Sequence, residues 1–218
     1  MSYHGRVHPG GPSDVRELAA LTITKFAVGD MNNNVYLLRC RVTDDQLLID
    51  AADDAPHILE VVGPDGLRTV ATTHQHWDHH RALPEVVAAT GAETVAGAED
   101  AEALPVSVTR TVGDGDIVEV GGSRLEVIHL VGHTPGSIAL LYDDPDGTPH
   151  VFTGDSLFPG GVGNTSGSAE AFTSLLHDVR TKLFNRLPDE TWFYPGHGDD
   201  STFGAERPHL EEWRERGW

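Results

Sequence analysis

The sequence predicts an α/β (α+β) fold in which two β-sheets pack face to face and helices cover both outer faces, a four-layer αββα sandwich. Runs of strand-like residues are closed by helical segments, and this arrangement is repeated along the chain. The length of 218 residues and the hydrophobic fraction of 39% suffice for one large core. Because no linker or change of composition divides the chain, we expect one domain over residues 1–218.

The first half of the chain should form a β-meander followed by further strands and helices. Residues 1–20 are expected to be a loosely ordered lead-in with one short helix around residues 14–20. Strand patterns bounded by turn residues occur at 21–28, 35–42, 46–50 and 68–73. Helical patterns closed by glycine occur at 56–62 and 81–91.

The second half should supply the second sheet and its helices. Strand patterns occur at 94–96, 137–142, 149–153 and 191–194. Residues 108–131 contain turn signals that divide them into three or four short strands. An amphipathic helix is expected at 169–187 and a terminal helix within residues 206–218.

Residues 73–80, with the sequence Thr-His-Gln-His-Trp-Asp-His-His, contain four side chains of metal-ligand type. In an extended segment His74 and His76 leave the same side of the backbone. Asp78 and His79 are adjacent, so the chain must turn there to direct both inward. The motif lies between a predicted strand and a predicted helix, where open α/β sheets place their sites. Taken alone, the His-x-His pair is equally typical of a polar turn.

Three further stretches each place one ligand-type residue beside glycine at the end of an apolar run. They contain His133 in Gly-His-Thr-Pro-Gly-Ser, Asp155 in Gly-Asp-Ser and His197 in Tyr-Pro-Gly-His-Gly. With these residues the chain resembles the metallo-β-lactamase superfamily, in particular its glyoxalase II-like branch. The resemblance covers about residues 21–207, and all five metal motifs occur in order. It implies the superfamily's αββα sandwich, consistent with the strand and helix pattern.

The resemblance implies a binuclear metal centre. The first ligand group would be His74, His76 and His133. The second ligand group would be Asp78, His79 and His197. Asp155 would bridge the two ions. Asp78 is also assigned a catalytic role. Nitrogen and carboxylate ligands suit Zn²⁺. We expect two zinc ions per chain, each with a coordination position left for water. A hydroxide between two such ions would serve as the nucleophile, so no serine or cysteine nucleophile is needed.

Residues around the ligands complete the expected site. The resemblance implies that Asp50 hydrogen-bonds near the metal loop without binding metal, although a helix cap is an equal alternative. Trp77 and Phe158 could be apolar walls of the substrate pocket or ordinary core residues. Asn164 is a further candidate for the pocket. We expect His80 to be exposed at the start of the following helix, although a donor to the ligands is the alternative.

The resemblance favours hydrolysis of a thioester, ester or lactone. The runner-up is a persulfide dioxygenase, which would use one Fe²⁺ held by His74, His133 and Asp155. Antibiotic hydrolysis is disfavoured, because β-lactamases of this fold generally lack a bridging aspartate. Flavodiiron oxidoreductases carry glutamate where this chain has His76. A non-catalytic metal-dependent module is the competing class, and it would be expected only if a ligand were missing.

The substrate should differ from that of the glutathione-handling relatives. Those proteins carry Gly-Cys-Gly-Arg in the loop after the bridging aspartate, whereas residues 161–164 here are Gly-Val-Gly-Asn. They also have a longer, basic C-terminal part, whereas the tail here is rich in glutamate. We therefore expect a thioester of a different thiol, or a neutral ester.

The net charge of −19 argues against nucleic acid and membrane surfaces as partners, which leaves a small-molecule substrate. The family often dimerises, so a homodimer remains open. No apolar stretch reaches the ~18 residues of a membrane span, and residues 1–12 lack the apolar centre of a signal peptide. A cytoplasmic location is the expectation. The single cysteine, Cys40, cannot form an internal disulfide and is expected to be buried.

Overall fold

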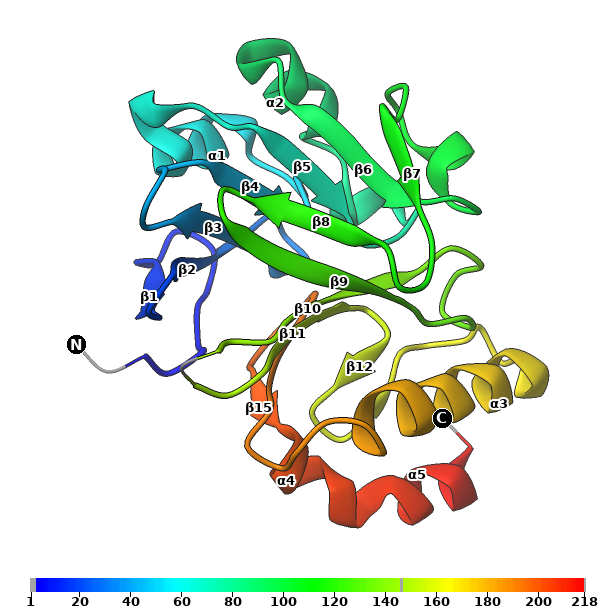
Figure 1. The fold of residues 1–218 in the computed structure, drawn as a ribbon. Helices are drawn as coiled ribbons and strands as arrows, with labels where there is room; N and C mark the ends of the chain where they lie inside the picture. The colour runs from blue at the N-terminus through cyan, green and yellow to red at the C-terminus, as the bar shows by residue number, and fades with distance from the viewer. Residues whose placement is uncertain (1–2, 146, 218) are drawn as a thin grey trace.

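Two β-sheets form the centre of the structure, and helices cover the outer face of each (Figure 1). This computed structural model describes residues 3–145 and 147–217. Met1 and Ser2, at the start of the expected lead-in, and Trp218, at the end of the expected terminal helix, lie outside the described residues, as does Asp146. The predicted four-layer sandwich is confirmed.

The first sheet has seven strands, whose spatial order follows the chain. They are β1 (Asp14–Glu17), β2 (Leu21–Val28), β3 (Asn33–Cys40), β4 (Gln46–Ile49), β5 (Thr69–Thr72), β6 (Glu93–Gly97) and β7 (Arg110–Val112). The strands from β1 to β4 are antiparallel, and those from β4 to β7 are parallel. Parallel neighbours need a crossover, which α1 (Ala55–Val62) supplies between β4 and β5 and α2 (Leu83–Thr90) between β5 and β6.

The second sheet has the order β15-β14-β11-β10-β9-β8. Its strands are β8 (Ile117–Val120), β9 (Ser123–His129), β10 (Ile138–Tyr142), β11 (His150–Gly154), β14 (Trp192–Pro195) and β15 (Ser201–Thr202). A small hairpin of β12 (Leu157–Phe158) and β13 (Gly161–Val162) follows β11. The neighbours β11 and β14 are parallel, so the residues that follow each of them emerge side by side.

Three apolar cores hold the four layers together. One lies between the sheets and includes Leu38 and Phe152. A second packs the outer face of the first sheet against α1 and α2, with Ile58 at its centre. The third packs the second sheet against the C-terminal helices through Leu175 and Trp213. Burial of each such side chain contributes about 1.5–3 kcal/mol to the stability of the fold. Each layer is therefore stabilised by its own apolar contacts.

Capping residues mark helix ends in the first half of the chain. Asp54 caps α1 by accepting a hydrogen bond from the amide of His57, and Gly91 ends α2 with φ of 70°. The expected helix at 169–187 is α3 (Ala169–Asp178), which continues as a π-helical segment, η4 (Val179–Phe184). Short 3₁₀ helices are η1 (Gly63–Asp65), η2 (Trp77–His79) and η3 (Ala101–Ala103). None of the described helices combines the length and apolar composition that crossing a membrane requires.

The lead-in differs from expectation, and the helix predicted near residues 14–20 is wrong. Residues Asp14–Glu17 instead form β1, which pairs antiparallel with β2. An isolated helix this short cannot offset its nucleation cost, whereas the edge of β2 offers backbone partners at once. The start of the described chain is not loose either, because Gly5 is buried and the Tyr3 hydroxyl donates to Asp200 at 2.7 Å.

The expected terminal helix is also interrupted. The chain forms α4 (Phe203–Glu206), a 3₁₀ turn η5 (Arg207–His209) and α5 (Leu210–Arg216). Pro208 lies at the break, where its missing amide and ring disfavour a continuous helix. Cys40 is buried, as expected.

Candidate metal centre

The metal loop begins where β5 ends, and it turns as its sequence requires. His76 is extended, with φ of −66° and ψ of 133°, and the 3₁₀ turn η2 follows at once. This turn directs the adjacent side chains of Asp78 and His79 toward the same region, and both are buried. A continuous strand would have sent them to opposite faces.

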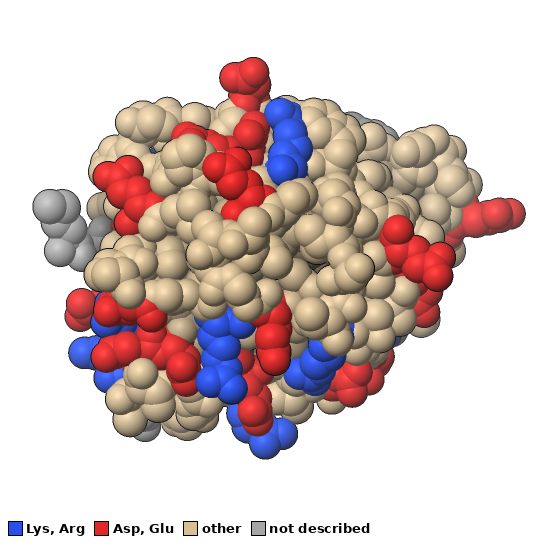
Figure 2. Space-filling model, turned by 90° about the horizontal axis from the view of Figure 1, so that it is seen from above, with Lys and Arg blue, Asp and Glu red and all other residues tan. Residues whose placement is uncertain are grey.

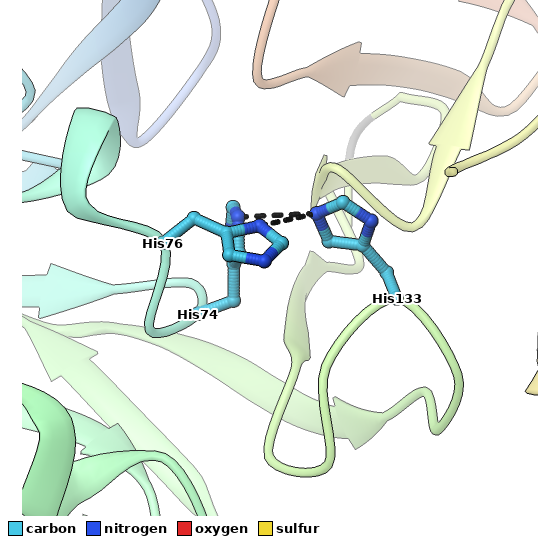
Figure 3. Close-up of side chains that lie close together, drawn as sticks. All are labelled: His74, His76 and His133. Carbon is cyan, nitrogen blue, oxygen red and sulfur yellow. Dashed lines mark hydrogen bonds between the residues drawn. The ribbon is translucent and has the colours of Figure 1, made fainter. Parts of the chain in front are cut away.

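The first ligand group brings together three imidazoles from two loops (Figure 3). The Nε2 atom of His133, in the loop between β9 and β10, lies 2.9 Å from Nδ1 of His76 and 3.3 Å from Nε2 of His74. Figure 3 shows the three rings facing one another from opposite sides. The structure therefore brings these three residues together, as a metal site would require.

The second ligand group joins the metal loop to the segment after β14. The Nε2 atom of His197 lies 3.3 Å from the Asp78 carboxylate and 3.2 Å from Nε2 of His79. The amide of Asn33 donates to the same Asp78 oxygen at 2.9 Å. Three distant segments, at residues 33, 78–79 and 197, thus meet at one point.

The Asp155 carboxylate lies between the two groups. One of its oxygens is 3.7 Å from Nε2 of His133 and 3.5 Å from Nε2 of His197, and the other is 3.4 Å from Nε2 of His79. Asp155 follows β11 directly, and His197 follows the parallel strand β14. Gly196 makes this approach sterically possible, because a Cβ there would lie 2.1 Å from an Asp155 oxygen.

The donor set fits a bound cation. The outer Nδ1 atoms of His79, His133 and His197 lie 2.8, 2.7 and 3.0 Å from acceptor oxygens of Asp50, Asn164 and Met31. In the neutral form of each ring, Nδ1 therefore carries the proton and Nε2 presents a lone pair to the centre. One oxygen of Asp155 is buried without a hydrogen-bond partner. Converging lone pairs and a lone carboxylate oxygen call for positive charge, which divalent metal ions supply.

Asp50 supports the metal loop from behind. Its carboxylate accepts hydrogen bonds from the amide and hydroxyl of Thr73 at 2.7 and 2.8 Å and contacts Nδ1 of His79 at 2.8 Å. The alternative that Asp50 caps a helix is wrong, since Asp54 caps α1. Asp50 thus fixes the orientation of His79 without itself facing the centre.

The electrostatics of the two groups differ. Burial would lower the pKa of His79, but the Asp155 and Asp50 carboxylates outweigh it and raise that pKa to about 10. Burial and the neighbouring His79 instead hold the pKa of His74 well below its usual range. Burial would raise the pKa of Asp155, yet His79 and the other imidazoles keep it well below the ordinary value. The two groups therefore differ in protonation, because His79 in the second group favours the protonated form and His74 in the first group favours the neutral form.

The prediction for His80 is wrong. Its side chain is only 7% exposed, and Nε2 lies 3.0 Å from the carbonyl oxygen of Gln75. Because the 3₁₀ turn reverses the chain, the His80 side chain packs against the metal loop and does not begin an exposed helix. Its ring closes the loop from Gln75 to His80.

Two supporting residues were missed in the sequence. Asp100 is fully buried, and its carboxylate accepts from the amides of Gln75 and Gly136, thereby joining the metal loop to the loop of His133. Asn33, in a run of three asparagines, begins β3 and donates to Asp78. Asp100 lies three residues after the end of β6 and belongs to no metal motif. Nothing local distinguishes Asn33 from its neighbours.

The three candidate pocket residues lie around the centre but differ in role. Trp77 is 55% exposed, and the Arg81 guanidinium stacks 3.9 Å from its ring centroid while also contacting Asp53 at 3.1 Å. Phe158 is half-buried, with its ring 6.5 Å from that of His197. Asn164 uses its backbone oxygen on His133, and its side chain is exposed.

A cavity of about 270 Å³ lies beside Asn164. The residues that line it are uncharged, namely Val162, Gly163, Asn164, Thr165, Gly167, Ser168, Ala169 and Gly217. Such a lining offers hydrogen bonds and small apolar surfaces but no cation for a carboxylate.

Comparison with known proteins identifies the chain's relatives. The sequence model of the metallo-beta-lactamase superfamily matches residues 28–197. The hydroxyacylglutathione hydrolase of Rhodospirillum rubrum is 35% identical over 83% of this chain and 67% of that protein. Across five such hydrolases the match spans 60–67% of their length. These relatives support the prediction of an enzyme of the hydrolase class.

Two solved structures are similar in both fold and sequence. ETHE1 from Myxococcus xanthus has a TM-score of 0.75 and 28% identity, with 88% of this chain and 84% of that chain covered. TTHA1623 in a di-iron-bound form has a TM-score of 0.68 and 29% identity, with 83% and 95% covered. The predicted family and its glyoxalase II-like relatives are thus confirmed, and ETHE1 is a structural neighbour.

Proposed function

The chain belongs to the metallo-beta-lactamase superfamily, and from this premise we propose that it is a metal-dependent hydrolase that cleaves a thioester, ester or lactone at a binuclear centre. The observation that carries the proposal is the position of Asp155, whose two oxygens lie 3.4–3.7 Å from imidazoles of both ligand groups. One carboxylate in this place can serve two ions, whereas a single-ion site would need only one group.

The seven proposed ligands are His74, His76, Asp78, His79, His133, Asp155 and His197. When bound, two divalent ions, Zn²⁺ in this proposal, supply Lewis-acid polarisation of a carbonyl and a water acidified toward neutrality. The relative solved in a di-iron-bound form supports two ions and keeps Fe²⁺ as the alternative metal.

The surrounding residues would hold the ligands ready for this chemistry. Asp50 keeps Nδ1 of His79 protonated, so that Nε2 remains a ligand. Asn33 donates to one oxygen of Asp78 and thereby fixes its orientation. We assign Asp78 a catalytic as well as a ligand role, because its carboxylate lies 3.3 Å from Nε2 of His197 and is oriented by Asn33.

The substrate is proposed to be uncharged near the metals. Several relatives are named hydroxyacylglutathione hydrolase, but none of the described residues that line the cavity beside Asn164 is cationic. The nearby Arg81 already contacts Asp53 and stacks on Trp77. Trp77 and Phe158 would offer apolar contacts to an acyl or thiol group. A thioester of a weakly anionic thiol, or a neutral ester, fits this surface better than glutathione's two carboxylates.

A persulfide dioxygenase with one Fe²⁺ is the second candidate. It is favoured by the similarity to ETHE1 and by the convergence of His74, His133 and Asp155. That function would leave Asp78 and His197 without a use. The complete second group therefore favours the hydrolase.

Partners other than a small-molecule substrate are not part of the proposal. On the face seen in Figure 2, lysine and arginine side chains are scattered among acidic ones and form no broad basic patch. With the net charge of −19, this disfavours nucleic acid. A homodimer and a cytoplasmic location remain predictions from the sequence.

The deciding experiment combines metal analysis with an oxygen test. Protein purified without added metal is analysed for elements, and turnover of acyl thioesters and aryl esters is measured with and without oxygen. Two ions per chain and oxygen-independent hydrolysis support the proposal. One iron, with activity on a persulfide that stops under anaerobic conditions, would establish the dioxygenase instead.

A further inference from the structure

The first described residues of the chain are joined to the segment after His197 by a buried ion pair. Lys25 lies in the middle of β2 and is fully buried, and its ammonium contacts an Asp200 carboxylate oxygen at 2.6 Å. We propose that this pair and residues 3–5 form a clamp, the Lys25 clamp, that positions His197 and thereby sets the metal affinity of the second ligand group. The inference rests on the proposed two-ion centre.

Every donor of the Lys25 ammonium has an acceptor. Besides Asp200, it donates to the carbonyl oxygens of Gly5 and Gly198, both at 2.8 Å. A buried ammonium tolerates no vacant donor. The three acceptors are therefore held at fixed positions, and Gly198 is the residue next to His197.

The Asp200 carboxylate completes the clamp from the other side. Its second oxygen accepts from the Tyr3 hydroxyl at 2.7 Å and from the Trp192 indole at 3.1 Å. Gly5, with φ of 69°, packs so closely that a Cβ would lie 2.5 Å from that oxygen. Residues 3–5 thus form one wall of the clamp, and only glycine fits at the point of contact.

His197 is the ligand that most needs such support. Its side chain is 24% exposed, against 9% for Asp78 and 0% for His79. The Met31 carbonyl contacts the His197 ring at 3.0 Å. The backbone of the segment is held by Asn34, which contacts Gly196 and Gly198 through its amide groups. Because Gly198 is shared by Asn34 and Lys25, loss of Lys25 should loosen this segment first.

The first ligand group is held by different contacts. Asp100 joins the metal loop to the His133 loop, and Thr73 contacts Nδ1 of His74. None of these contacts involves Lys25, Asp200 or Tyr3. The clamp therefore predicts an effect on one group only, which a general loss of stability would not produce.

The test replaces Lys25 and follows metal binding and local opening. Metal-free Lys25→Met is titrated with Zn²⁺, and amide hydrogen exchange of Asn34 is measured without metal, because that amide donates to Gly196 at 2.7 Å. We expect the second equivalent of Zn²⁺ to bind at least about tenfold more weakly to this variant, which is the usual loss when a residue that orients a metal ligand is replaced. The first equivalent should be unchanged, and Asn34 should exchange faster.

The matched control is Gln46→Met, which removes another buried polar side chain that bonds two carbonyls, those of Val62 and Gly66, away from the centre. It should leave both equivalents and the exchange of Asn34 unchanged. Equal weakening of both equivalents in Lys25→Met, no weakening at all, or the same pattern in Gln46→Met would overturn the proposal.

If Lys25→Met does not fold, Tyr3→Phe tests the same proposal. It removes one donor to Asp200 and should weaken the second equivalent several-fold while accelerating exchange of Asn34. Unchanged values for both would contradict the clamp. If the unaltered protein bound only one ion, the two-ion proposal would fail, and the exchange rates would still decide whether the clamp holds the His197 segment.

Discussion

Two buried polar clusters share the segment that follows β14, and they differ in how completely their groups are paired. In the metal centre, imidazole lone pairs face one another and an Asp155 oxygen has no hydrogen-bond partner. In the Lys25 clamp, the ammonium has three acceptors and Asp200 accepts from three side chains. The incomplete cluster needs a ligand from outside the chain, whereas the complete one stabilises the fold by itself.

The largest effect is expected at the carboxylate shared by both ligand groups. Asp155→Ala should lower metal content at both groups together and reduce kcat/KM by more than about 100-fold, since even residues behind ligands cost 10–100-fold in affinity. His197→Ala should instead empty mainly the second group. Elemental analysis and esterase or thioesterase assays measure both. Two full equivalents and normal turnover in Asp155→Ala would remove the bridge from the proposal.

The next largest effect should come from the residue behind His79. Asp50→Asn removes the charge that fixes the His79 imidazole, and the second equivalent should bind about 10–100-fold more weakly. Asp45→Asn, which alters a carboxylate on the surface beside Arg68, is the control and should bind metal normally. Calorimetric titration with Zn²⁺ compares them. Equal affinities would mean that Asp50 is structural only.

A change of stability with pH is expected from His150, which is in β11 and is not one of the proposed metal ligands. Burial and Arg16 lower the pKa of His150 to about 4, and its Nδ1 lies 2.8 Å from the Tyr194 hydroxyl. The unfolded chain binds this proton near pH 6.5 and the folded chain does not, so stability is lost as pH falls from 6.5 toward 4. At pH 5 the loss is about 2 kcal/mol.

Urea unfolding at pH 7 and pH 5 checks this expectation for the unaltered protein and for His150→Gln. The variant should lose about 2 kcal/mol less over this interval, because glutamine does not titrate. An identical pH dependence in both proteins would show that His150 titrates normally in the folded chain.

The smallest effect is expected at the rim, outside both clusters. Trp77→Ala removes a half-exposed ring, and KM for a neutral thioester should rise about two- to fivefold while kcat stays constant. Val42→Ala, at another exposed hydrophobic residue remote from the loop, is the matched control. A fall in kcat with constant KM would place Trp77 in the chemistry instead of the pocket.

The fold and the ligands were predictable because their signals are local. Strand ends, glycines and ligand-type side chains coincide at His133, Asp155 and His197, and the family pattern assigns them to one centre. The layers and the family are confirmed, whereas the role of each ligand stays a prediction. The turn η2 also followed from sequence, since adjacent Asp78 and His79 can face inward only where the chain turns.

The supporting contacts were not predictable, because they join residues far apart in the chain. Lys25 and Asp200 are separated by 175 positions, and a lysine within a strand normally faces solvent. His80 was assigned to the surface because its neighbours form the start of a helix. The strand β1 forms only because β2 presents an edge, which no property of residues 14–17 reveals.

The pairing of β14 between β11 and β15 has a consequence for the order of assembly. Asp155 and His197 become neighbours only when β14 pairs with β11, and residues 198–200 then close on residues 3–5. The chain from residue 3 to His133 already contains every residue of the first group. During synthesis from the N-terminus, all ligands of the first group are therefore present before the second group is complete. Binding of the second ion would then indicate that β14 has paired with β11.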